Sequence, residues 1–131
     1  GVSGALRNAC KPDNVCGAVK VWWEDDGTRR EGKRVPTTFC GLQPAGGRLR
    51  DVQGVRLICH AVGPMWTDYP VEESTFGKMV PRIKRTVRRA LDACRRVGAR
   101  SCCLPAISGG IFTHYKVGTD IKEREQRAAR R

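Results

Sequence analysis

The most regular pattern of apolar and polar positions runs through residues 78–97. The apolar residues there recur at spacings of three and four: Val80, Ile83, Val87, Leu91, Cys94 and Val97. Most basic residues lie off this stripe: Lys84, Arg85, Arg88, Arg89, Arg95 and Arg96. The pattern predicts an amphipathic helix capped by Gly98. Pro81 would lie in its first turn or inside a longer helix that begins near Ser74.

Two apolar runs that flank this helix predict strands. Residues 55–62 form the first run, and residues 101–107 form the second and lead into a glycine-rich segment at 108–112. A strand, a helix and a second strand make a β-α-β unit, which implies a right-handed crossover and a largely parallel sheet. Ligands bind such sheets at the carboxyl ends of the strands, where segment 108–112 is expected.

The first half of the chain is less regular. The expected elements are a glycine-rich turn (1–4), a short helix (5–10), a strand (17–23), a polar hairpin or loop (24–35) and another loop within 41–54. Pro12 ends the short helix, and Asp26-Gly27 is the turn signal of the hairpin.

Composition and charge narrow the class of protein. Apolar residues make up 40% of the chain, which argues against a disordered linker, and no run approaches the ~20 apolar residues of a membrane helix. No membrane partner is expected. Lys and Arg number 25 against 13 Asp and Glu, a formal net charge of +12. A field of this sign attracts phosphates whatever the domain does.

Seven cysteines are present, and none forms a C-x-x-C pair. The sequence therefore predicts neither a metal site nor a redox motif of the thioredoxin type, and no cofactor is expected. Cys59, Cys94, Cys102 and Cys103 stand among apolar neighbours and are expected to act as small core residues. The odd count argues against a full disulfide framework, so we expect a reducing compartment, the cytoplasm or the nucleus.

Two glycine-rich segments, 1–4 and 108–112, carry the candidate chemistry. Glycine lets backbone N–H groups approach an anion without a Cβ in the way, and a helix N-terminus after Gly4 adds a partial positive charge. Two such loops facing each other would make a cleft for a diphosphate, with Phe112 closing over a sugar ring. The same spacing also fits two ordinary turns beside a core phenylalanine.

Three short motifs resemble the macrodomain family, and they occur in the family's order. Residues 1–6 (GVSGAL) look like its first phosphate loop and following helix, and residues 60–64 (HAVGP) resemble its H-x-V-G-P strand end. Residues 104–112 (LPAISGGIF) are similar to its second loop. The match covers about residues 1–115. It implies a three-layer α/β/α fold with a mixed, largely parallel central sheet, and ADP-ribose binding at the strand ends.

The resemblance also assigns the contacts. Val2 and Ser3 would touch the proximal ribose and the diphosphate from one side, the second loop would offer backbone N–H groups from the other, and Phe112 would flank the distal ribose. The implied ligand-binding residues are Gly1, Val2, Ser3, Pro105, Ser108, Gly109, Gly110, Ile111 and Phe112.

The chain departs from the family pattern in three places. It starts inside the first loop, so the strands that supply an acidic residue for the adenine and an Asn for the distal ribose do not precede it. Ser3 stands where many hydrolases of the family have an Asp, and nothing after Tyr115 resembles the family's closing strand and helix. We therefore expect a partial macrodomain over 1–121, incomplete at its N-terminus and divergent at its C-terminus, and a basic polar tail over 122–131.

The main functional prediction is a module that binds ADP-ribose, free or attached to protein. One alternative is a hydrolase that removes ADP-ribose from a side chain, which the missing Asn and Asp make less favourable. A second alternative is non-specific nucleic-acid binding through the arginine-rich helix 78–97, although arginines of this kind also occur as a solvated face.

Overall fold

The computed structural model describes residues 2–13, 19–65 and 74–107. Predictions about Gly1, segment 108–112 and the tail 122–131 lie outside this part of the chain. The elements within it are α1 (Val2–Ala9), β1 (Val21–Trp23), β2 (Arg29–Glu31), β3 (Cys40–Pro44), α2 (Gly47–Asp51), β4 (Leu57–Ala61) and α3 (Ser74–Arg96).

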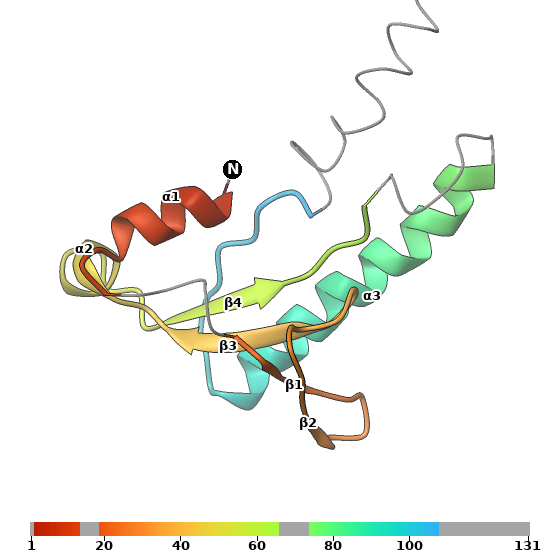
Figure 1. Cartoon of the computed structure of the whole chain (residues 1–131), viewed down its shortest axis with the longest axis horizontal. Coiled ribbons are helices and arrows are strands. Elements are labelled where there is room, and N and C mark those ends of the chain that lie inside the picture. Colours follow the sequence, from red (N-terminus) through yellow and green to blue (C-terminus); the bar gives the residue numbers. More distant parts are fainter. Residues whose placement is uncertain (1, 14–18, 66–73, 108–131) are drawn as a thin grey trace, which may run out of the picture.

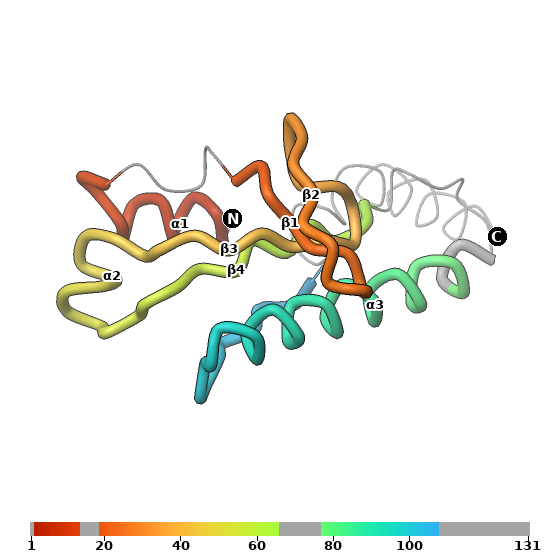
Figure 2. The backbone as a smooth tube through the Cα atoms, turned by 90° about the horizontal axis from the view of Figure 1, so that it is seen from below, coloured from red at the N-terminus to blue at the C-terminus, as the bar shows by residue number. Residues whose placement is uncertain are grey.

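Helices lie on both sides of the β3–β4 pair. Figure 2 shows α1 and α3 on opposite sides of these strands, and Figure 1 shows α2 at the end of the pair beside α1. On the α3 side the helix packs against both strands, and on the other side α1 packs against α2. The described chain therefore has a helix–strand–helix layering around β3 and β4.

The strand pairing corrects one prediction. β3 and β4 are antiparallel, with Cys40 opposite Ala61 and Pro44 opposite Leu57. β1 and β2 form a second antiparallel pair. Only residues 45–56 connect β3 to β4, and this connection is occupied by the single short helix α2, which suits a reversal of direction better than a parallel crossover. The largely parallel sheet that we expected is thus not seen among the described strands, and residues 101–107 form no strand.

The loop expected within 41–54 contains two regular elements, β3 and α2. Their sequence is rich in glycine and polar residues, so no local periodicity reveals them. A small core holds these two elements in place, and Leu6 and Ala9 of α1 pack against it. The core consists of Cys10, Ala45, Leu49 and Ile58, with Val55 also packed against it. Tertiary contact rather than propensity therefore accounts for this region.

Gly47, the first residue of α2, packs against the chain just after α1. Its φ of +51° and its contact with the Cys10 carbonyl leave no room for a side chain, and its N–H donates a 2.9 Å hydrogen bond to the Asp13 carboxylate. Only glycine meets both conditions without strain.

The β1–β2 hairpin confirms the turn expected at Asp26-Gly27. Gly27 has a φ of +88°, and the Thr28 N–H donates to the Asp26 carboxylate at 2.8 Å. The Asx-type bond fixes the turn locally, which is why the dipeptide predicts it.

Helix α3 confirms the strongest sequence pattern and corrects its orientation. It begins at Ser74 and contains Pro81, and Gly98 adopts a φ of +72° just after its end. Its most deeply buried residues are Met79, Thr86 and Ala90, whereas Leu91 and Val97 of the predicted stripe are 43% and 45% exposed. The buried face is therefore rotated from the stripe of large apolar residues and combines Met79 with the smaller Thr86 and Ala90, which let the helix approach the strands closely.

Candidate functional site

The first half of the predicted binding site lies in the first turn of α1. The helix begins at Val2, earlier than the expected residue 5, so Val2 and Ser3 belong to the turn itself. Both side chains are exposed, and the turn contains no acidic residue. The first backbone N–H groups of a helix have no acceptor within it and carry a partial positive charge. This turn therefore presents donors that suit an anion.

The second half is described only up to residue 107. Pro105 is exposed and lies in segment 99–107, which has neither helix nor strand. Figure 1 shows this segment running back from the end of α3 past β3 and β4 and ending on the side of β4 where α1 begins. The remaining predicted contacts, Gly1 and residues 108–112, lie outside the described chain, so the meeting of the two loops stays a prediction.

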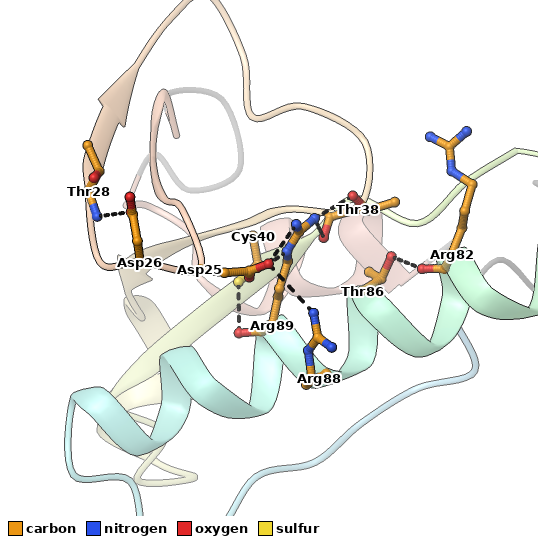
Figure 3. Close-up of polar contacts among 9 residues, drawn as sticks. All are labelled: Asp25, Asp26, Thr28, Thr38, Cys40, Arg82, Thr86, Arg88 and Arg89. Carbon is orange, nitrogen blue, oxygen red and sulfur yellow. Dashed lines mark hydrogen bonds and ion pairs between the residues drawn. The ribbon is translucent and has the colours of Figure 1, made fainter.

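A polar cluster that no sequence pattern predicts is centred on Arg89 of α3 (Figure 3). Its guanidinium donates to both carboxylate oxygens of Asp25, at 3.0 and 3.1 Å. It also donates to the carbonyl and hydroxyl oxygens of Thr38, at 3.2 and 2.6 Å, and lies 3.7 Å from the centre of the Phe39 ring. Arg89 thus links α3 to the β1–β2 hairpin and to the segment before β3.

This cluster corrects the expectation that Arg89 belongs to a solvated basic face. Its side chain is only 13% exposed, whereas that of its neighbour Arg88 is 61% exposed. The hydrogen bond from Arg89 lowers the pKa of Asp25, and the charges of Arg88 and Arg85 act in the same direction. The exposed basic surface of α3 therefore excludes Arg89, whose charge is compensated by Asp25.

A cavity of about 260 Å³ lies between β1, β3 and α3. Its charged lining combines acidic and basic groups: Glu24, Asp25, Asp92, Arg89 and Arg96. Because three carboxylates accompany two guanidiniums, one of which already binds Asp25, the cavity does not provide the uncompensated donors that a diphosphate requires. We therefore do not assign the predicted ligand to it.

Other residues with candidate chemistry have structural roles. The His60 ring makes a 3.0 Å hydrogen bond with the Gln43 amide across the β3–β4 pair, and burial lowers the pKa of His60. His60 therefore acts as a structural histidine whose ring is satisfied by Gln43. Trp22 and Trp23 are half-buried on β1. Within residues 2–13, 19–65 and 74–107, no group of three or more His, Cys, Asp or Glu side chains is arranged to hold a metal ion.

Comparison with known families decides the identity of the domain. The sequence model of the Macro domain family matches residues 1–119. The chain belongs to the macro domain family. Comparisons with curated proteins and with solved structures find no match.

Membership confirms the resemblance inferred from the three motifs, and the macro domain fold accounts for the layers seen in Figure 2. In the α/β/α fold of the family, helices cover both faces of the sheet, as α1 and α3 do here for β3 and β4. None of the described helices of this macro domain has the length and apolar content of a membrane span.

Proposed function

We propose that this macro domain binds ADP-ribose, free or attached to a protein. Macro domains generally bind ADP-ribose, and the match over residues 1–119 is the observation that carries the proposal. In this proposal the first turn of α1 forms one side of the diphosphate site, and residues 108–112 form the other.

Local chemistry at α1 supports the proposal. Val2 and Ser3 are exposed, so a ligand can reach the backbone N–H groups of the turn. No carboxylate in the turn competes for these donors, and the chain as a whole carries a net charge of +12. A helix N-terminus with free donors in a positive field is a favourable phosphate site.

Binding without hydrolysis is the function that the chain's residues favour. Hydrolysis of an ADP-ribosyl bond needs a group that positions or activates a water beside the anomeric carbon. Ser3 supplies a hydroxyl where many hydrolases of the family supply a carboxylate, so α1 lacks the usual group for this step. We therefore expect ADP-ribose to bind without turnover of an ADP-ribosylated protein.

The direct test is titration calorimetry of the full chain with ADP-ribose, with AMP as the control ligand. The Ser3→Glu variant places a carboxylate at the first turn of α1, where it favours the helix but repels a diphosphate. We expect at least a tenfold loss of ADP-ribose affinity with no loss of thermal stability. The matched control is Gln53→Glu, which adds the same charge at an exposed position after α2 and should bind like the unmodified chain.

The outcomes distinguish an error in the proposed site from an error in the proposed function. Unchanged affinity in Ser3→Glu would remove α1 from the site, and a folded chain that binds no ADP-ribose would overturn the proposal. Salt dependence distinguishes bulk nucleic-acid binding, because affinity for a polyanion falls steeply between 50 and 200 mM salt, by roughly 10³-fold or more when six phosphates are contacted. We expect ADP-ribose affinity to change much less.

A further inference from the structure

Four thiols from separate segments meet on the α3 side of the strands. Six of the seven cysteines lie in the described chain, and all six are free thiols. Four of them form a row in which each thiol interacts with the next: Cys40 of β3, Cys59 of β4, Cys94 of α3 and Cys102 of the segment after α3. The sequence predicts small core residues at Cys59, Cys94 and Cys102 and assigns no role to Cys40, whereas Cys102 is in fact exposed.

The strand register places the first two thiols together. Cys40 lies opposite Ala61, and Cys59 lies opposite Leu42, so the two cysteines are diagonal neighbours on one face of the pair. The Cys40 thiol donates to the Arg89 carbonyl at 3.5 Å, so this face is turned towards α3. Cys94 follows the buried Ala90 by one helical turn and is therefore on the side of α3 that faces the strands.

The chain reversal at the end of α3 brings Cys102 back towards Cys94. The Ala99 N–H donates to the Cys94 carbonyl at 3.0 Å, and Gly98 reverses the chain with its φ of +72°. Segment 99–107 then runs back towards the strands (Figure 1). Burial raises the pKa of Cys94, and the neighbouring Cys102 thiol raises it further, also by a hydrogen bond. Cys102 itself is exposed, whereas Cys94 is half-buried.

We propose that this row is an oxidation site for hydroperoxides, in which Cys102 is the thiol that reacts first with the peroxide and Cys94 is the resolving thiol. The Cys102 sulfur attacks one oxygen of hydrogen peroxide, the O–O bond breaks, and a sulfenic acid and one water form. The Cys94 sulfur then attacks the sulfenic sulfur, and a second water leaves as the disulfide forms. Both thiol protons end in the two waters, so each disulfide consumes one peroxide.

Geometry favours this pair over Cys40 and Cys59. Diagonal cross-strand neighbours such as Cys40 and Cys59 have Cα atoms roughly 7–8 Å apart. A disulfide needs less than about 7 Å, and two paired strands resist the shift. Cys102 lies in a segment with no helix or strand, so its backbone can adjust towards Cys94. The thiols also form a row and do not surround one point, in agreement with the absence of a metal-binding group among the described residues.

Cys40 is the competing site for the first attack. The hydrogen bond with Cys59, together with the charges of Arg89 and Arg96, lowers the pKa of Cys40, which favours its thiolate. Its residue is only 7% exposed, although it borders the cavity between β1, β3 and α3. We therefore expect peroxide to reach Cys102 before Cys40.

The test treats the reduced full chain with hydrogen peroxide, blocks the remaining thiols by alkylation and maps tryptic peptides by mass spectrometry. Trypsin separates the two cysteines into peptides 90–95 and 101–116. We expect these peptides to become linked, while the number of free thiols falls from seven to five. In Cys94→Ser we expect the link to disappear and dimedone to label Cys102 as the trapped sulfenic acid.

Two further variants make the outcome decisive even if Cys94→Ser does not fold. Cys102→Ser changes an exposed residue and should abolish the link, whereas the matched control Cys103→Ser, also exposed, should retain it. A link that survives in Cys102→Ser would overturn the proposal, as would earlier modification of Cys40 or a dominant link between peptides 35–48 and 57–78. None of these measurements involves ADP-ribose.

Discussion

The guanidinium of Arg89 holds both oxygens of Thr38, the hydroxyl at 2.6 Å and the carbonyl at 3.2 Å. Thr38 is 4% exposed and has a φ of +73°, a conformation that β-branched residues rarely adopt. Its N–H donates to the Val62 carbonyl at 2.7 Å. Helix α3 and the chain after β4 therefore act together to hold a strained residue beside β3.

Replacing Arg89 should destabilise the fold far more than replacing its neighbour. Arg89→Ala leaves the buried oxygens of Thr38 without their donor, and we expect a loss of about 2–3 kcal/mol in the free energy of unfolding. Arg88→Ala removes an exposed 3.6 Å ion pair with the same Asp25 and should cost less than about 1 kcal/mol. Urea unfolding followed by tryptophan fluorescence measures both. Equal losses would show that Arg89 acts only as a surface charge.

The Arg89–Asp25 contact predicts a stability change at acid pH. The hydrogen bond from Arg89 lowers the pKa of Asp25 in the folded state below its ordinary value of 3.8. The stabilisation of the fold by the Arg89–Asp25 pair is therefore complete above the pKa that Asp25 has in the unfolded chain. It is lost as the pH falls through the lower pKa of the folded state. We expect Asp25→Asn to melt earlier than the unmodified chain at pH 7 and the difference to shrink below about pH 4. A difference that grows on acidification would contradict the pairing.

The rotated face of α3 predicts unequal losses of stability when two large apolar residues are truncated. Met79 is completely buried, and Met79→Ala should cost about 2–4 kcal/mol through lost burial and the cavity left behind. Leu91 belongs to the apolar stripe but is 43% exposed, so Leu91→Ala should cost no more than about 1 kcal/mol. Thermal melts with calorimetry measure the two losses. A larger loss for Leu91 would restore the face inferred from the sequence.

Substitution of two glycines with positive φ measures the cost of backbone strain and the cost of steric crowding separately. Gly47 has a φ of +51° and contacts the Cys10 carbonyl, whereas Gly54 has a φ of +70° and no atom near the position of a Cβ. Gly54→Ala should therefore cost about 1 kcal/mol from the backbone conformation alone. Gly47→Ala must also displace the backbone of Cys10 and Lys11 just after α1, and we expect it to cost at least twice as much. Similar losses in urea unfolding would mean that α1 moves freely away from α2.

The local sequence pattern was sufficient to predict the elements whose structure depends on neighbouring residues. The three- and four-residue spacing predicted α3, the apolar run 55–62 predicted β4, and Asp26-Gly27 predicted the hairpin turn. Each of these signals lies within a few residues of the element that it predicts. The pattern was insufficient for β3 and α2, whose glycine-rich sequence becomes regular only where β4 and the small core pack against it.

The sequence by itself determined the family, because its three short motifs stand in the family's order. It also predicts a phosphate turn at Val2 and Ser3, which the structure places in the first turn of α1. Only the tertiary structure decided which face of α3 is buried, that β3 and β4 run antiparallel, and that Arg89 is an internal anchor. The physical reason is the distance along the chain. Arg89 meets Thr38 and Asp25 across 51 and 64 positions, and no local pattern records a contact between residues so far apart.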